Sequence, residues 1–234
     1  LIDAAAVCGC EYYVIDAGWY APGEWWDSVG EWKECRDRFP NGIKEVTDYI
    51  RKKGMVPGVW LELEVMGINC EKAKKAPDDW FFVRHGKRVY DRSRYQLDFR
   101  NPAVIEHVNE VIDRVVKEYG VGYIKMDYNI EPGIGTEIGA ESVGQGLLEH
   151  EKAYLNWLDG VFARYPDLVI ENCSSGGLRM DYALLSRYSI QSTSDQEDYR
   201  NFATIAANSP AGVTPEQAAI WSYPMRQGDK EEVI

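Results

Sequence analysis

Carboxylate residues close a series of short apolar runs along this sequence. The residues in these positions are Asp16, Glu62, Glu64, Asp127, Glu171 and Asp195. If the runs are parallel strands of a barrel, their carboxyl ends meet at one face, and the side chains found there can share one site. Two carboxylates in such a site could attack the anomeric carbon of a sugar and protonate the departing oxygen. The same ring of carboxylates also suits other hydrolases, isomerases and lyases.

Aromatic residues gather near the same run ends, where their rings could pack against the apolar C–H faces of a sugar. They are Trp19, Tyr20, Trp25, Trp26, Trp32, Trp60 and Tyr128. Structural interpretations remain open for these features. An Asp at a strand end can cap a helix, as can Ser174 or Ser175. Trp25 and Trp26 could belong to the core, and the two Glu residues could pair with Arg or Lys.

The elements that must position these side chains alternate between strand and helix. Strands are predicted at 11–16, 55–65, 122–129, 167–172, 189–195 and 216–224. Helices are predicted at 40–54, 103–120, 151–165, 177–188 and 201–210. In the first helix Ile43, Val46 and Ile50 recur at helical spacing, and Gly54 ends it. Segment 68–100 has an irregular pattern and is predicted to be an insertion.

Repeated strand–helix pairs indicate an α/β fold with a parallel sheet. About six such pairs favour a (β/α)8 TIM barrel, and the GxGxxG spacing of a dinucleotide-binding sheet is absent. A complete barrel has eight strands in about 250 residues. We therefore expect residues 1–234 to form one catalytic barrel domain that is incomplete, with the first and last strands missing.

The amino-acid composition argues against several kinds of binding partner for this chain. The chain has 38 acidic and 26 basic residues and a net charge of −12, which disfavours nucleic acid as a partner. No apolar run approaches the ~18–20 residues that cross a membrane. The five cysteines are irregularly spaced, which suits a reducing compartment. The three histidines are scattered, so no metal site and no cofactor are predicted.

Several strings, in order along the chain, resemble glycoside hydrolase family 36, the bacterial α-galactosidase family. The nucleophile strand of that family is similar to YIKMDYN at 123–129, with Lys125, Asp127 and Asn129 at the matching positions. Its second strand is similar to IDAGWY at 15–20. Further counterparts are GEW at 30–32, the stretch 39–66, LDFRNP at 97–102, ENCSSGGLR at 171–179 and TSDQED at 193–198. The resemblance thus covers nearly the whole chain.

The resemblance implies a retaining exo-α-glycosidase that releases terminal α-D-galactosyl residues from oligosaccharides. Asp127 would be the nucleophile and Asp195 the acid/base, with Asp198 in the same loop as the alternative. Lys125 would bind sugar hydroxyls and favour the ionised form of Asp127. The substrate-binding residues that the resemblance implies are Asp16, Trp60, Arg92, Lys125, Asn129, Cys173 and Arg179.

One departure from the family pattern bears on the substrate. The family usually has a second Asp after Asp16, and this chain has Ala17. Loss of a buried acceptor for a sugar hydroxyl costs about 1–3 kcal/mol. The change predicts a weakened contact to the 6-hydroxyl or a different glycone, such as N-acetylgalactosamine or L-arabinopyranose.

Other hypotheses remain. The chain could be an inactive fragment that only binds sugar, or a metal-dependent isomerase or an aldolase in which Lys125 forms a Schiff base. Family members also carry a β-sandwich domain before the barrel and a small β domain after it, and we expect both to be absent here. The expected location is the bacterial cytoplasm, and the full-length protein could form a homo-oligomer.

Overall fold

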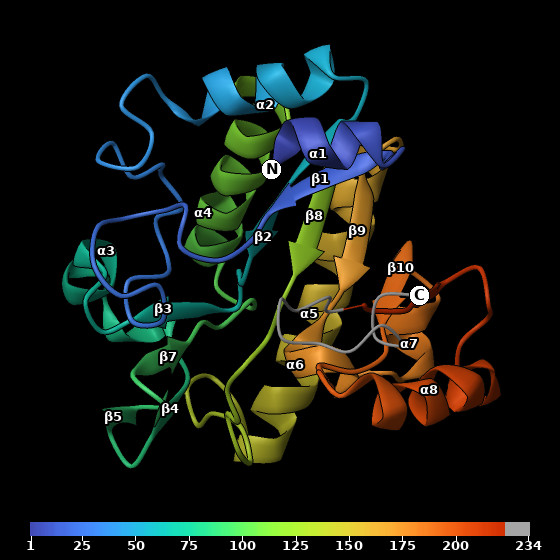
Figure 1. Ribbon diagram of the computed structural model, residues 1–234. Helices are drawn as coiled ribbons and strands as arrows, with labels where there is room; N and C mark the ends of the chain where they lie inside the picture. The colour runs from blue at the N-terminus through green and yellow to red at the C-terminus, as the bar shows by residue number, and fades with distance from the viewer. Residues whose placement is uncertain (223–234) are drawn as a thin grey trace. The chain divides into compact units, whose positions relative to one another are not determined.

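Three parallel strands form the centre of the first part of the chain. The computed structural model describes residues 1–222 and divides into two units, Leu1–Leu168 and a second unit that begins at Val169. In the first unit β2 (Val56–Leu61) lies between β1 (Tyr12–Ile15) and β8 (Tyr123–Met126), as Figure 1 shows. The register pairs Trp60 with Lys125 and brings Asp16 to the same level, one residue beyond the Ile15–Val59 pair.

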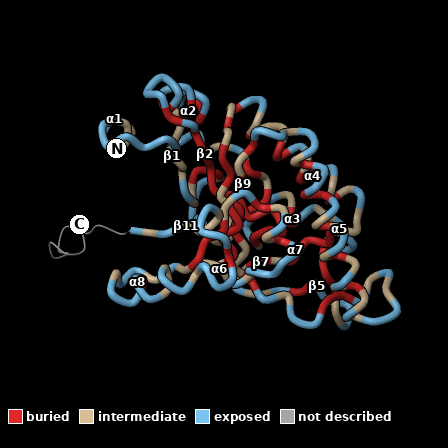
Figure 2. Tube along the Cα trace, turned by 90° about the vertical axis from the view of Figure 1, so that its right-hand side faces the viewer, coloured by how far each residue is buried: buried red, intermediate tan, exposed pale blue. Residues whose placement is uncertain are grey.

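Strand β2 is the buried centre of this sheet. All of its residues after Val56 are buried, which is typical of a parallel strand covered on both faces. Gly58 is required by packing, because a Cβ there would lie 2.9 Å from the Val14 side chain and 3.0 Å from Tyr123. Figure 2 shows how burial differs along the chain, with the short helix α1 (Ile2–Val7) half-buried or exposed throughout.

Two of the three main helices of the first unit begin with a side-chain cap, and the third, α2, begins after Gly42 without one. Helix α2 (Ile43–Lys52) turns Ile43 and Ile50 inward. Helix α4 (Pro102–Asp113) begins at Asn101, whose side chain accepts from the Ala103 amide, and continues as a π-helical segment, Arg114–Glu118. Helix α5 (Val143–Arg164) begins eight residues before the predicted start at 151, because Ser142 caps it through the Gln145 amide.

The predicted irregular insertion is ordered, and the long strand predicted at 55–65 is wrong at its end. Strand β2 stops at Leu61, and Val65 belongs to an antiparallel sheet of β3 (Val65–Gly67), β7 (Arg94–Gln96) and β6 (Tyr90–Asp91). A hairpin of β4 (Val83–Arg84) and β5 (Lys87–Arg88) follows helix α3 (Glu71–Lys75) and the 3₁₀ turn η1 (Asp78–Trp80). The strands are two or three residues long, too short to give a clear alternation in the sequence.

The second unit has its own parallel strands. Strand β10 (Ile190–Ser192) pairs with β9 (Val169–Asn172) and with β11 (Ala218–Ala219). Helices α6 (Ser174–Gly177), α7 (Tyr182–Leu185) and α8 (Tyr199–Asn208) and the 3₁₀ turn η3 (Ser209–Ala211) connect them. The strand predicted at 216–224 is reduced to β11, and residues 223–224 lie outside the described residues.

The single helix predicted at 177–188 is wrong. The chain passes through positive φ values at four successive residues, from Ser174 to Gly177, and helix α7 starts only at its Asp181 cap. Elsewhere the alternation of parallel strands and helices agrees with the predicted α/β class and is consistent with an incomplete (β/α) barrel. Within residues 1–222 no helix has the length and apolar character needed to cross a bilayer.

Candidate active site

Asp127 stands directly after strand β8 and is held by two hydrogen bonds to its carboxylate. The Trp60 indole Nε1 donates to Oδ2 over 3.0 Å, and the Tyr128 backbone amide donates to Oδ1 over 2.8 Å. The backbone amide of Asp127 donates to Leu61 O at 2.8 Å, which extends the β2–β8 pairing to the carboxylate. Asp127 is 8% exposed. The carboxylate is therefore fixed in orientation, as a nucleophile requires.

Lys125 links the ends of strands β8 and β1. Its Nζ donates to Asp16 Oδ2 over 3.0 Å, while Asp16 Oδ1 accepts from the Ala17 amide at 2.8 Å. The Lys125 side chain is largely covered, whereas the Asp16 side chain is 63% exposed. Two of the residues predicted to bind substrate are thus in direct contact, although they are 109 positions apart in the sequence.

Asn129 and Glu62 link the segments that follow strands β8 and β2. Both oxygens of the buried Glu62 carboxylate accept from Asn129, Oε1 from its backbone amide at 2.7 Å and Oε2 from its side-chain amide at 3.1 Å. Glu62 also pairs with the fully buried Arg94 of β7. Burial raises the pKa of Glu62, and the Arg94 guanidinium opposes that shift. The segment after Asp127 is therefore anchored by a buried charge pair.

Trp60 belongs to a packed group of aromatic rings. Its ring stacks with Tyr20 at 6.0 Å and 20°, and the rings of Trp25 and Trp32 each lie 5.8 Å away. Trp60 is only 1% exposed, and its backbone carbonyl accepts from Trp19 Nε1 at 2.8 Å. The indole is therefore rigid, and the hydrogen bond to Asp127 is the contact through which it reaches the candidate nucleophile.

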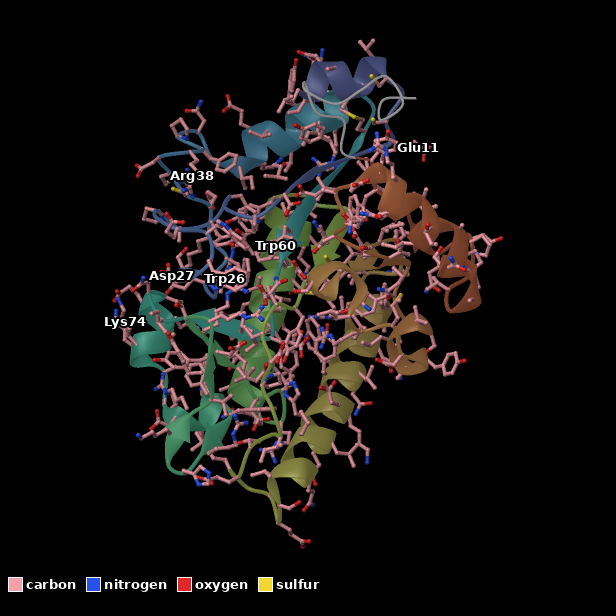
Figure 3. All side chains as sticks on the ribbon, turned by 60° about the horizontal axis from the view of Figure 1, so that its bottom comes forward. Glu11, Trp26, Asp27, Arg38, Trp60 and Lys74 are labelled. Carbon is pink, nitrogen blue, oxygen red and sulfur yellow. The ribbon has the colours of Figure 1, made fainter. Side chains whose placement is uncertain are left out.

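The loop between β1 and α2 is shaped by Arg38. Its guanidinium donates to the carbonyls of Gly18, Tyr20, Ala21 and Gly23 at 2.6–3.4 Å. Figure 3 labels Arg38 and Trp26 on this loop and Trp60 on β2. A pocket of about 490 Å³ opens between the loop and the end of β1, with Asp16, Ala17 and Trp25 in its lining. Ala17 thus lies at an open pocket beside the Asp16 carboxylate.

Arg92 is placed differently from the other predicted residues of the first unit. It lies in the β6–β7 turn with φ +46°, and its side chain is 57% exposed. The guanidinium lies 3.8 Å from the carboxylates of Asp91 and Glu131, while its backbone carbonyl accepts from Trp26 Nε1.

In the second unit a buried amide network supports the segment after β9. The side-chain amide of Asn172 donates to Arg179 O at 2.7 Å and to Gln191 Oε1 at 2.8 Å. Ser174 Oγ donates to Asn172 Oδ1 at 2.9 Å and accepts from Arg179 Nε at 3.0 Å. Cys173 is buried between these residues in the chain. The network holds two of the predicted substrate-binding positions, Cys173 and Arg179, on one turn.

Asp195 and Asp198 have different surroundings in the same loop. Asp198 caps helix α8, because its side chain accepts from the amides of Arg200 and Asn201 at 2.9 and 3.4 Å. Asp195 is exposed and lies against Gly176, where an added Cβ would be 2.6 Å from the Asp195 carboxyl carbon. Gly176 has φ +72°, so the left-handed turn and the absence of a side chain together make room for Asp195.

Sequence reasoning missed several residues that hold the candidate site. Arg94 and Gln96 fell within the segment predicted to be irregular, yet both are fully buried, and Gln96 Oε1 accepts from Tyr128 OH at 2.7 Å. Gly176 was visible only as part of a glycine pair. Glu62 was expected to pair with an Arg or Lys, and the structure shows that its partner is Arg94. In the described part of the chain no three His, Cys, Asp or Glu side chains come together in a way that could hold a metal ion.

Parallel strands with helices between them place the chain in the α/β class, and the arrangement is consistent with an incomplete (β/α) barrel. The chain belongs to the Melibiase family, whose model matches residues 1–218. It is 29% identical over 184 residues to alpha-galactosidase Mel36A of Lactobacillus acidophilus, and 31% identical over 202 residues to alpha-galactosidase AgaA of Geobacillus stearothermophilus. These matches cover 77% and 83% of this chain, and the chain spans about a quarter of each relative, 25% and 27%.

Solved structures show the same fold. The crystal structure of GH36 alpha-galactosidase AgaA from Geobacillus stearothermophilus superposes with a TM-score of 0.87 at 24% identity, over 96% of this chain and 32% of that one. TtGalA, an alpha-galactosidase from Thermus thermophilus in complex with stachyose, gives a TM-score of 0.72 at 19% identity, over 99% of this chain and 52% of that one.

Proposed function

We propose that this chain carries the catalytic carboxylates of a retaining exo-α-galactosidase. The observation that carries the proposal is the geometry of Asp127, a nearly buried carboxylate fixed by Trp60 Nε1 and the Tyr128 amide at the end of a parallel strand. The contact between Lys125 and Asp16 supplies polar groups for sugar hydroxyls at the level of Trp60, on the strands beside it. Relatives named alpha-galactosidase, and AgaA solved in complex with raffinose, support the substrate class.

In the proposed reaction Asp127 attacks the anomeric carbon while the bond from that carbon to the leaving oxygen breaks. Asp195 gives its proton to the leaving oxygen, and a covalent glycosyl–enzyme forms. Asp195 then takes a proton from water, the water oxygen attacks the same carbon, and the bond to Asp127 breaks. The exposure of Asp195 suits this exchange of protons, and the capping role of Asp198 leaves its carboxylate committed to helix α8.

Trapping of the intermediate tests this proposal. A fluorinated α-galactoside with an activated leaving group should label the protein once, and peptide mapping should place the label on Asp127. The Asp127→Asn variant is the control and should remain unlabelled. A folded protein that binds galactose but takes no label would leave only a sugar-binding role. Label on Lys125 after borohydride treatment with a carbonyl substrate would instead indicate Schiff-base chemistry.

A second candidate function concerns the glycone. Ala17 lines the pocket beside Asp16 where the family pattern has a carboxylate, so the contact to the 6-hydroxyl side of galactose is reduced. We propose that sugars without that hydroxyl, such as β-L-arabinopyranosides, or with another substituent, such as N-acetylgalactosaminides, compete well with galactosides. Ala17→Asp should raise the preference for nitrophenyl α-galactoside over nitrophenyl β-L-arabinopyranoside about tenfold, equivalent to about 1.4 kcal/mol. A strong galactoside preference in the unchanged protein would reject the idea.

The remaining features of the proposal concern the protein as a whole. Residues 1–234 would belong to one catalytic barrel domain. Its substrate would be an α-galactoside oligosaccharide. We also propose a bacterial cytoplasmic location, which the five free thiols support. A homo-oligomer stays a prediction that light scattering can test.

A further inference from the structure

A fully buried ion pair lies next to the candidate nucleophile. Glu62 and Arg94 both have side chains that are 0% exposed, and Arg94 Nη1 donates to Glu62 Oε2. Glu62 directly follows β2, and Arg94 opens β7, so the pair joins the central sheet to the antiparallel insertion. Burying two charges is costly unless hydrogen bonds satisfy them. Hydrogen bonds to neighbouring groups are therefore needed to hold this pair in the interior.

Besides Arg94, the Glu62 carboxylate accepts hydrogen bonds from Asn129, in the segment after Asp127. Oε1 accepts from the Asn129 backbone amide at 2.7 Å, and Oε2 accepts from the Asn129 side chain at 3.1 Å. All three partners of the carboxylate are donors, so the arrangement fits the ionised form. The backbone between Asp127 and Asn129 is short, and the contact to Glu62 limits its freedom.

Arg94 also contacts the loop that contains Trp26. Its Nε donates to Trp26 O at 2.7 Å, and its guanidinium lies 3.7 Å from the centre of the Trp26 ring. Its Nη2 is buried and has no hydrogen-bond partner in residues 1–222, and the aromatic face provides a favourable cation–π contact for the group. The Trp26-containing loop and the nucleophile segment are thus held by one guanidinium.

The pair also sets the charge near Asp127. The Glu62 and Asp127 carboxylates repel each other, and the Arg94 cation offsets that repulsion. Removal of the Glu62 charge would remove the repulsion and leave the Arg94 cation uncompensated. Both changes make the ionised form of Asp127 easier to reach.

We propose that Glu62 and Arg94 are positioning residues for the nucleophile, which fix the Asp127–Asn129 segment and balance the charge around it. The inference rests on the proposed glycosidase function of Asp127.

The test is the pH dependence of kcat/KM for Glu62→Gln. The amide keeps the size of the side chain and removes the charge. We expect kcat to fall about 10²-fold with little change in KM, because a misplaced nucleophile reacts more slowly, and we expect the acid limb of the profile to move to lower pH. Glu64→Gln is the matched control, because Glu64 is a buried carboxylate two residues further on whose imidazole partner is His150 at 3.4 Å. It should lower thermal stability without moving the acid limb.

The activity of the wild-type protein and a second variant, Arg94→Lys, separate the possible outcomes of this test. If Glu62→Gln has the kcat and the acid limb of the wild-type protein, the inference is overturned and the proposed function stays intact. If the wild-type protein itself has no glycosidase activity, the proposed function is rejected. If Glu62→Gln does not fold by circular dichroism, Arg94→Lys replaces it, since it keeps the charge but loses the planar fork. The inference then expects a lower kcat with the acid limb in place, and wild-type kcat would reject it.

Discussion

The two candidate catalytic carboxylates lie in contrasting surroundings. Asp127 follows a regular parallel strand, is nearly buried, and is fixed by an indole and a backbone amide. Asp195 follows a strand of three residues, is exposed, and lies on a loop against a left-handed turn. Asp127 accepts from a distant side chain, Trp60, and from the amide of its neighbour Tyr128, whereas the Asp195 loop passes close to the backbone of Gly176.

This contrast agrees with what the proposed double displacement requires. A nucleophile must stay ionised and keep its orientation through two displacements, which favours fixed donors around it. An acid/base must exchange a proton with the leaving group and with water, which favours an accessible carboxyl group. The difference between the two surroundings therefore predicts different consequences when each carboxylate is changed.

Loss of the nucleophile should have the largest effect. Asp127→Gly should lower kcat/KM by roughly 10⁴–10⁶-fold, the scale seen when a nucleophile is removed. Azide should enter the space left by the carboxylate and attack from the same face, so that activated α-galactosides give β-galactosyl azide. The product is identified by NMR, and formation of the α-azide would contradict the assignment.

Loss of the acid/base should be smaller and should depend on the leaving group. Asp195→Gly should cost about 10²–10⁴-fold with natural oligosaccharides and much less with nitrophenyl galactosides, which need little protonation. Azide should now attack the glycosyl–enzyme from the opposite face and give α-galactosyl azide. The control is Asp198→Ala, which should lower stability by about 1 kcal/mol through loss of the cap and retain activity. The reverse pattern would exchange the roles of Asp195 and Asp198.

The close approach at Gly176 should matter more than other glycines of the second unit. A Cβ at this position would lie 2.4 Å from the Asp195 backbone nitrogen, so Gly176→Ala must displace the Asp195 loop. A displacement of this size costs roughly 10²-fold in kcat. Gly212 has no atom within 4 Å of an added Cβ and a negative φ, so Gly212→Ala is the matched control. Equal activity of the two variants would show that backbone contact does not position Asp195.

The smallest expected effect concerns stability and pH in the first unit. Burial lowers the pKa of His107 to about 4, and its ring nitrogens contact Gly30 O at 2.8 Å and Lys72 Nζ at 2.7 Å. The unfolded chain binds a proton near pH 6.5, whereas the folded chain stays neutral until about pH 4. The contribution of neutral, buried His107 to the free energy of unfolding is therefore fully present above pH 6.5. It decreases by up to about 3 kcal/mol as the pH falls to 4.

Urea unfolding of the unchanged protein and of His107→Gln at pH 7 and pH 4.5 checks this effect. The difference in unfolding free energy between the two pH values should be larger in the unchanged protein by about 2–3 kcal/mol. Equal differences would mean that other groups account for its acid sensitivity.

Regular elements were predictable where local signals were strong. The strands around Tyr12–Ile15 and Tyr123–Met126 and the helix from Pro102 were found because apolar periodicity and the Asn101-Pro102 start act over a few residues. The short strands between Val65 and Gln96 were not found, since two or three residues carry no readable alternation. Helix α5 began earlier than predicted because its Ser142 cap lies before the apolar repeat.

The sequence by itself determined that Asp16, Glu62 and Asp127 directly follow parallel strands, because β propensity and the position of a polar residue after an apolar run are local properties. Tertiary structure decided which of these groups meet. The contacts of Lys125 with Asp16, of Trp60 with Asp127 and of Asn129 with Glu62 depend on the register of β1, β2 and β8. That register is set by the packing of residues far apart in the chain, such as Gly58 between Val14 and Tyr123, and no local pattern specifies it.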